Sequence, residues 1–280
     1  MPITWSDETA IAGADQVRVR LYRSDRSAGA LVLHLHGGAF IEGSLETGQV
    51  VPTLLAEAGA VVASVDYPRA PEARFPHALE AAFAALKWLH KSRGRWGHRK
   101  MPIVVAGEEA GGNLAAGVAL MSRDQQTPPL AGQILLSPML DPQMATCSMR
   151  EAEAGPVGCK WADGWHQYLG SADKASHPYA APLASTRLFG LAPTLILTAE
   201  DDLMRDESLR YAQRLRSSCV CVQEHTLAAP TGWPCAFSGC ASTNYPWADA
   251  VRERFAEFLE HVRMPHPCVS DKSSHHTIEA

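Results

Sequence analysis

The sequence predicts an α/β fold with a mostly parallel central sheet, helices on both faces of the sheet and a small helical cap. Short apolar runs bounded by turn residues alternate with amphipathic stretches that are long enough to be crossover helices. The apolar runs are rich in Val and Leu, as strands are when helices bury both of their faces. One connection, residues 142–181, is too long for a simple link between two strands, and it predicts the cap.

The elements of the first half follow in order. Residues 17–22 alternate apolar and charged side chains, which is typical of a half-exposed strand. Residues 30–35 and 60–65 are short apolar runs, and both are expected to be buried strands. Pro76 opens a helix, because a proline in the first turn loses no hydrogen bond. Apolar side chains between positions 79 and 89 fall on one face of that helix and predict its buried side.

The second half continues the alternation. Strands are expected at residues 103–106, 132–136, 194–198 and near 219–225, and helices at 110–121, 205–217 and 247–262. The regular order predicts one domain over residues 1–264, with the cap inserted at about 142–181. Residues 265–280 are polar and are expected to be a disordered tail.

Composition excludes several classes of function. The chain has 280 residues, of which 46% are hydrophobic and 20% charged, as expected for a soluble globular protein. Its net charge of -5 gives no overall footprint for nucleic acid, and the basic run at residues 91–100 is expected to be a solvated loop rather than a partner patch. No apolar stretch reaches membrane-spanning length, so no membrane association is expected.

The N-terminus and the cysteines predict the compartment. The first residues lack the basic and apolar pattern of a signal peptide, which predicts a cytoplasmic location. The seven cysteines have no zinc-site spacing, so no metal is expected, and no cofactor is expected either. In the cytosol these thiols are expected to be reduced; one disulfide is the less favoured alternative, because disulfides are typical of secreted proteins.

Two glycine motifs follow predicted strands and lie where such sheets bind ligands, at the carboxyl ends of the strands. The first is His36-Gly37-Gly38-Ala39-Phe40, whose glycines let backbone N–H groups approach a ligand closely. A pair of such N–H groups can stabilise an oxyanion, although a tight turn explains a lone Gly-Gly equally well.

The second motif, residues 107–112, has the layout of a nucleophile elbow, the sharp turn between strand and helix that presents a catalytic side chain. Gly107 and Gly111 flank position 109 with the required spacing of small residues, and Glu109 stands at the apex. Ala110 is expected to supply a third N–H to the oxyanion hole formed with Gly37 and Gly38. The positive end of the following helix favours an anion at the apex.

The motifs taken together resemble the bacterial hormone-sensitive-lipase type of esterase, within the α/β-hydrolase fold. The resemblance covers about residues 17–262 and rests on a series of motifs in order: residues 36–40 with Gly43-Ser44, then 65–72, 75–80, 107–112, 178–183 and 198–207. Such a series is far more specific than any single member. The family also has a longer N-terminal helical arm over the pocket, which this chain is expected to lack, and it often forms homodimers.

The resemblance implies a triad of Ser, Asp and His. Asp202 occupies the Asp position, Glu109 the Ser position and Thr231 the His position, while Glu108 replaces the usual Asp before the serine. His225 lies six residues before position 231 and is interpreted as an ordinary strand histidine. Without a hydroxyl nucleophile and a base, the standard acyl-serine mechanism through this site is excluded on chemical grounds.

Three uses of Glu109 remain open. Its carboxylate can bend into its own oxyanion hole and plug it, which would lower its pKa. It can approach Asp202, so that one of the two carboxyl groups holds a proton and the pair is suited to acid/base chemistry. It can attack an electrophile or activate water, as an Asp at the elbow does in related dehalogenases and epoxide hydrolases.

Three functions are therefore weighed, each with a small molecule as substrate or ligand. The first is a repurposed, non-hydrolytic enzyme that performs elimination, cyclisation or decarboxylation with Glu109 as acid or base. The second is an inactive pseudo-hydrolase that binds a small molecule or scaffolds a partner. The third is a residual carboxylic ester hydrolase.

Overall fold

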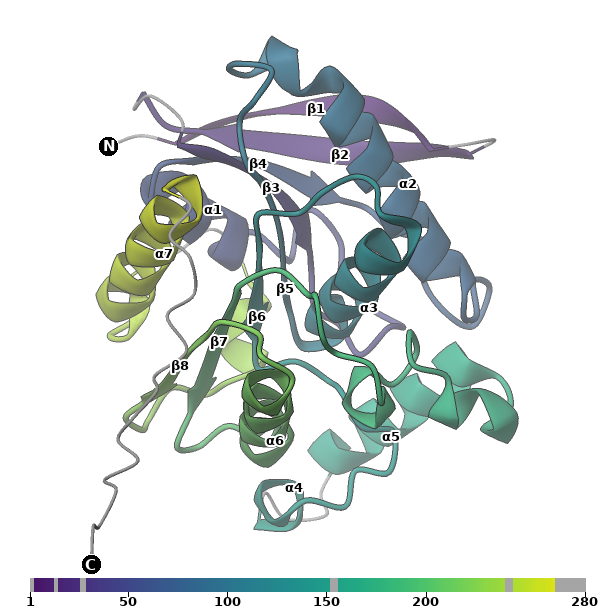
Figure 1. The fold of residues 1–280 in the computed structure, drawn as a ribbon. Helices are drawn as coiled ribbons and strands as arrows, with labels where there is room; N and C mark the ends of the chain where they lie inside the picture. The colour runs from purple at the N-terminus through teal and green to yellow at the C-terminus, as the bar shows by residue number, and fades with distance from the viewer. Residues whose placement is uncertain (1–2, 13–14, 26–28, 152–155, 240–243, 265–280) are drawn as a thin grey trace, which may run out of the picture.

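The computed structural model describes residues 3–12, 15–25, 29–151, 156–239 and 244–264, so the tail expected at 265–280 lies outside the described residues. An eight-stranded sheet runs through the molecule in the order β1-β2-β4-β3-β5-β6-β7-β8 (Figure 1). Its strands are β1 (Thr4–Ala12), β2 (Asp15–Arg23), β3 (Ala30–Leu35), β4 (Ala60–Val65), β5 (Ile103–Glu108), β6 (Gly132–Leu136), β7 (Thr194–Ala199) and β8 (Val222–Leu227). Among the described residues, β1 pairs with β2 and β2 with β4 in antiparallel fashion, whereas β3 to β8 are mutually parallel.

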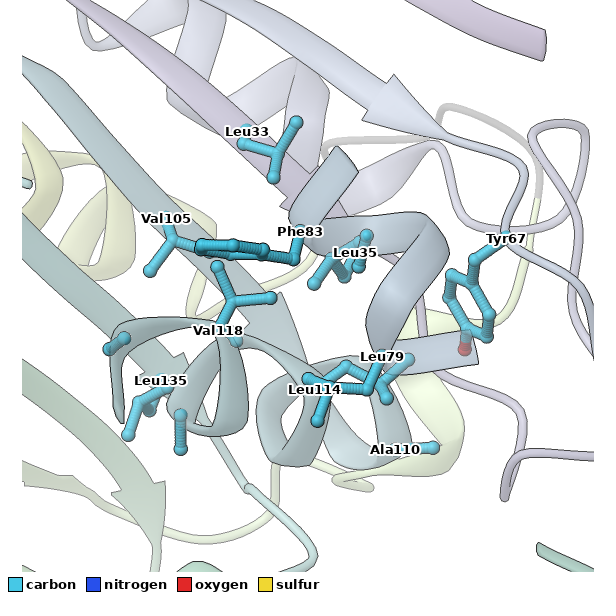
Figure 2. Packing of buried hydrophobic residues seen from close by; sticks show 14 of the residues in the cluster. Leu33, Leu35, Tyr67, Leu79, Phe83, Val105, Ala110, Leu114, Val118 and Leu135 are labelled. Carbon is cyan, nitrogen blue, oxygen red and sulfur yellow. The ribbon is translucent and has the colours of Figure 1, made fainter. Parts of the chain in front are cut away.

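Helices cover both faces of the sheet, as predicted. On one face lie α2 (His77–Ser92), α3 (Glu109–Gln125) and α6 (Arg205–Ser217); on the other lie α1 (Val50–Glu57) and α7 (Ala248–Arg263) (Figure 1). Figure 2 shows Phe83 of α2 and Val118 of α3 packed against Val105 of β5. Burying each such side chain contributes about 1.5–3 kcal/mol, so this layer fixes α3 and therefore the turn that precedes it.

The expected cap segment holds α4 (Cys147–Glu151), α5 (Pro156–Leu169) and the short helix η2 (Ala172–Ser176). Its helix α5 packs against the loop that follows β3, residues 36–43, here called the glycine loop. The contact is made by aromatic rings: Tyr168 stacks on Phe40 with ring centres 4.0 Å apart. A Cβ atom at Gly164 would overlap the backbone oxygen of Ala39, so this glycine permits the close approach. The cap is thus seated directly over the end of β3.

The structure corrects three expectations. Strand β1 precedes the first predicted strand, and α1 occupies a connection for which no helix was predicted. Strand β1 was missed because it lies at the sheet edge and five of its nine residues are polar or charged: Thr4, Ser6, Asp7, Glu8 and Thr9. Cys221 is disulfide-bonded, contrary to the expected reduced thiols. The sequence did not predict this bond, because spacing along the chain does not reveal which sulfurs approach each other.

None of the described helices has the length and apolar character that a membrane span requires.

Candidate functional site

The turn between β5 and α3 has the geometry of an elbow. Glu109 at its apex has φ of +53°, a left-handed conformation that is unfavourable for a residue with a side chain. A Cβ atom at Gly107 would overlap the backbone of Gly111, and one at Gly111 would overlap the backbone of Leu35. Both glycines are therefore required by contact, and together they bring the apex beside the end of β3.

The loop after β3 lies against this elbow because β3 and β5 are neighbours, with Leu35 opposite Gly107 in the register. His36 holds the loop in place: its ring stacks on Tyr67 with centres 4.4 Å apart, and its Nδ1 donates to the Gly37 carbonyl over 2.7 Å. The Tyr67 hydroxyl donates to the His36 carbonyl, also over 2.7 Å. Gly38 has φ of +121°, which only glycine adopts without strain.

Glu109 bends into the glycine loop. Its Oε2 accepts the N–H of Gly38 over 2.6 Å, and its Oε1 accepts the indole N–H of Trp161 from the cap helix α5. The approach is so close that a Cβ atom at Gly37 would lie 2.5 Å from Oε2. Only 4% of Glu109 is exposed. Of the three uses that the sequence leaves open, this arrangement corresponds to a carboxylate occupying its own oxyanion hole.

Glu108 occupies the neighbouring donor, which sequence reasoning missed. Its Oε1 accepts the N–H of Gly37 over 3.1 Å, and its Oε2 accepts Nε2–H of His34 over 2.7 Å. The other ring nitrogen of His34 then accepts the hydroxyl of Ser64 over 2.9 Å. The register of β4, β3 and β5 aligns these side chains on one face of the sheet, and a linear motif does not contain that register. The Gly37 and Gly38 donors are thus both taken by carboxylates, while Ala110 lies fully buried in the first turn of α3.

Burial and the neighbouring groups shift the pKa of Glu109 in opposite directions. Burial raises the pKa of Glu109, and this outweighs the lowering by Lys160 and by the Gly38 and Trp161 hydrogen bonds, so the net direction is upward. The hypothesis that Glu109 plugs its own oxyanion hole implied a lowered pKa for this carboxyl group. That expectation is wrong, because burial away from water disfavours the charged form of Glu109. For Lys160, burial lowers the pKa, but the nearby carboxylates of Glu109 and Glu42 raise it above its usual value. Lys160 Nζ lies 3.2 Å from Glu42 Oε2, which ties the cap to the glycine loop.

Asp202 has a different set of partners. Its Oδ1 accepts the Ser137 hydroxyl over 2.6 Å and the Met204 N–H over 2.9 Å, and its Oδ2 accepts the Thr198 hydroxyl over 2.6 Å. Burial raises its pKa against these three hydrogen bonds. Among the described residues, no hydrogen bond joins Asp202 to Glu109, so the paired-carboxylate arrangement is not the one that this structure adopts.

Thr231 turns to the neighbouring Asp201. Its hydroxyl donates to Oδ1 of Asp201 and its N–H to Oδ2, both over 2.7 Å, and the Gly232 N–H adds a bond of 2.9 Å. Burial acts to raise the pKa of Asp201, but these donors outweigh it and the pKa is lowered. Sequence reasoning placed Thr231 at the histidine position and did not anticipate Asp201 as its partner.

His225 lies in β8, and among the described residues no hydrogen bond joins it to Glu109 or Asp202. Burial lowers its pKa, and the charges that act on it are those of Glu224, Arg254 and Glu257. Within the described part of the chain, no group of three or more His, Cys, Asp and Glu side chains is arranged to hold a metal ion.

Comparisons with known proteins identify the family. Residues 32–229 match a family model described as alpha/beta hydrolase fold. An arylesterase of Saccharolobus solfataricus is 33% identical over 210 residues, which are 73% of this chain and 68% of that protein. Esterase LipI of Mycobacterium tuberculosis is 35% identical over 207 residues, which are 72% of this chain and 64% of that protein.

Solved structures give the same result over more of the chain. The thermophilic carboxylesterase EstE1, cloned from a metagenomic library, is 32% identical with a TM-score of 0.81, covering 94% of this chain and 91% of its own. A bacterial heroin esterase is 31% identical with a TM-score of 0.79, covering 94% and 85%. With the family model, these similarities establish that this chain belongs to the α/β-hydrolase family of esterases and carboxylesterases.

Proposed function

We propose that this chain is a pseudo-hydrolase: a member of an esterase family that does not transfer acyl groups and instead has a binding role, toward a small molecule or a protein partner. The observation that carries the proposal is the 2.6 Å hydrogen bond from the Gly38 N–H to Glu109. An oxyanion hole accelerates acyl transfer only if its donors are free to meet the developing charge. Here a side chain of the protein itself uses that donor.

Three further contacts support the proposal. The Gly37 N–H donates to Glu108, so displacement of Glu109 alone would not free the pair of donors. Trp161, which is 1% exposed, covers Glu109 from the cap. Thr231 carries no basic nitrogen and its hydroxyl is committed to Asp201. Each of these contacts opposes polarisation of, and attack on, an ester carbonyl at position 109.

A second candidate is a non-hydrolytic enzyme that uses Glu109 as acid or base in elimination, cyclisation or decarboxylation. The raised pKa of Glu109 favours it, because a pKa shifted upward from the usual carboxyl range suits acid/base chemistry. Its weakness is access: both oxygens of Glu109 have donors, and the side chain is 4% exposed. Asp202, its expected partner, is held by Ser137 and Thr198. We therefore rank this candidate second.

Hydrolysis of 4-nitrophenyl acetate by the full chain tests the proposal. The wild type, Glu109→Ala and Glu109→Gln are each expected to match the rate without protein. Glu253→Gln, on the exposed face of α7, is the control for loss of one carboxylate. Turnover by the wild type that is retained in Glu253→Gln but lost in both Glu109 variants would refute the proposal and favour catalysis by Glu109.

A further inference from the structure

A second concavity, in the connection that precedes β5, whereas the elbow follows β5, is lined by cations. It has a volume of about 710 Å³ and lies where α2 ends, with His90, Lys91, Arg93, Arg95 and Arg99 in its wall. The stretch from residue 81 to residue 107 carries six Lys and Arg residues and neither Asp nor Glu, in a chain whose net charge is -5. Positive charge is therefore concentrated here against the overall sign of the protein.

Most of these cations have no acidic partner. Arg95 Nη1 pairs with Glu8 Oε2 of β1 at 3.0 Å. Within the described residues, no carboxylate lies within ion-pair distance of Lys91, Arg93 or Arg99, whereas many other arginines of the chain are paired. Unpaired guanidinium groups around one hollow retain their hydrogen-bond donors for a ligand.

The loop that carries the cations is anchored. Trp96 is 8% exposed, and its ring packs against Trp88 of α2 with centres 5.3 Å apart. Arg95 lies over the Trp96 ring at 5.0 Å, and the side chain of Arg99 lies over Gly94. This anchoring lowers the entropy cost of ordering the cations around a ligand.

Stabilisation of α2 does not account for the whole cluster. Basic side chains near a helix C-terminus interact favourably with its dipole, which explains Lys91 in the last turn. Arg99 lies seven residues beyond the last residue of that helix, Ser92. The partial charge of the helix end, roughly half an elementary charge, is also too small to require this many cations.

We infer that this concavity, the basic hollow formed by His90, Lys91, Arg93, Arg95 and Arg99, binds a small soluble anion with two or more phosphate groups. Guanidinium groups match phosphate oxygens in geometry and charge. The volume lies in the range of small-molecule sites, and a hollow fits a compact anion better than it fits the flat surface of a membrane. The inference is independent of the state of Glu109.

Calorimetric titration of the full chain with sodium tripolyphosphate at low ionic strength tests this inference. We expect saturable binding with one site per chain that weakens as salt is added, because mobile ions screen the cations. Arg93→Gln/Arg99→Gln is expected to weaken the binding by about tenfold or more, since two charge-assisted contacts are lost. Arg23→Gln/Arg210→Gln removes the same charge from two other exposed positions and is expected to leave the affinity unchanged.

Several outcomes would overturn the inference. Wild-type protein that shows no saturable heat would do so, as would equal weakening in the two double variants. Binding to vesicles containing phosphatidylglycerol without binding to tripolyphosphate would assign the hollow to a lipid surface instead. Circular dichroism and thermal melting check that each variant is folded. If Arg93→Gln/Arg99→Gln fails to fold, Arg99→Gln alone, whose side chain lies outside α2, takes its place with Arg210→Gln as the control.

Discussion

The indole nitrogen of Trp161 donates to Oε1 of Glu109, which joins the cap helix α5 to the apex of the elbow. The other oxygen of Glu109 accepts the Gly38 N–H over 2.6 Å. One carboxylate therefore connects three segments that are far apart in sequence: the cap, the elbow and the glycine loop. In an esterase of this fold that point is where the substrate carbonyl reacts. Here it is a structural junction.

Removal of the indole donor tests the strength of this junction. We expect Trp161→Phe to lower the free energy of unfolding by about 1–3 kcal/mol, because a buried carboxylate loses a donor while the aromatic ring is kept. Urea unfolding followed by circular dichroism measures the change. Trp165→Phe is the matched control, because Trp165 lies in the same helix and packs against Phe40, whereas the donors to Glu109 are Gly38 and Trp161. Equal losses of unfolding free energy in the two variants would show that Trp161 stabilises the junction by packing alone.

The glycines of the elbow are expected to be indispensable. In Gly111→Ala the new methyl group would overlap the backbone of Leu35, which cannot move without disturbing β3. We expect a loss of more than about 3 kcal/mol of unfolding free energy, or failure to fold. Gly29→Ala is the control, since its nearest neighbours would lie 4.0 Å away, and it is expected to change stability by less than about 0.5 kcal/mol. Thermal melting of the two variants compares them.

Acid is expected to destabilise the glycine loop through His36. Burial lowers the pKa of His36 to about 4, although the Gly37 carbonyl acts to raise it. Its Nε2 is buried and has no hydrogen-bond partner, so protonation there would place an unpaired N–H inside the protein. The neutral form is favoured in the folded state. The stability that comes from keeping His36 neutral is complete above about 6.5, the pKa of this group in the unfolded chain. It is lost as the pH falls towards 4, the pKa of His36 in the folded protein.

This dependence is measured as the urea midpoint between pH 7 and pH 4. The wild type is expected to lose up to about 3 kcal/mol across that window. His36→Phe keeps a ring to stack on Tyr67 and does not titrate, so its profile is expected to be flatter. Parallel profiles for the two proteins would show that the acid sensitivity arises elsewhere.

Restoration of the missing chemistry tests whether the rest of the pocket is intact. Glu109→Ser alone is expected to hydrolyse 4-nitrophenyl acetate no faster than the wild type, because it has no base. Glu109→Ser/Thr231→His is expected to exceed the wild-type rate by roughly a hundredfold, which is the scale of general-base catalysis. The loop at 231 is held to Asp201 partly by two backbone N–H groups, which the substitution leaves in place. Glu109→Ser/Thr226→His places the histidine at an exposed strand position as a control.

The sequence predicted much of the fold because burial leaves a simple pattern. The bounds of β3, β4, β6 and α6 agree with the predicted ranges, since each is a continuous apolar run or a strongly periodic stretch between turn residues. Helix α1 was missed because almost every residue in it is buried, which removes the amphipathic period. Strand β1 was missed because edge position permits polar residues.

The site was only partly predictable. Gly37, Gly38 and Glu109 were expected together because motif spacing reports backbone turns, and turns fix where N–H groups point. Partners of buried side chains depend instead on which strands are neighbours. The contact of Glu108 with His34 requires the adjacency of β3 and β5, and the contact of Asp202 with Ser137 requires that of β6 and β7. A linear motif contains neither relationship.

The amide proton of Gly38 tests the central claim most directly. In the wild type, its NMR resonance is expected far downfield, because the N–H donates a charge-assisted hydrogen bond to Glu109 over 2.6 Å. Glu109→Ala is expected to move this resonance strongly upfield, while the Gly37 resonance, whose acceptor is Glu108, moves much less. A Gly38 resonance at an ordinary position in the wild type, unchanged in Glu109→Ala, would contradict the claim that this carboxylate fills the oxyanion hole.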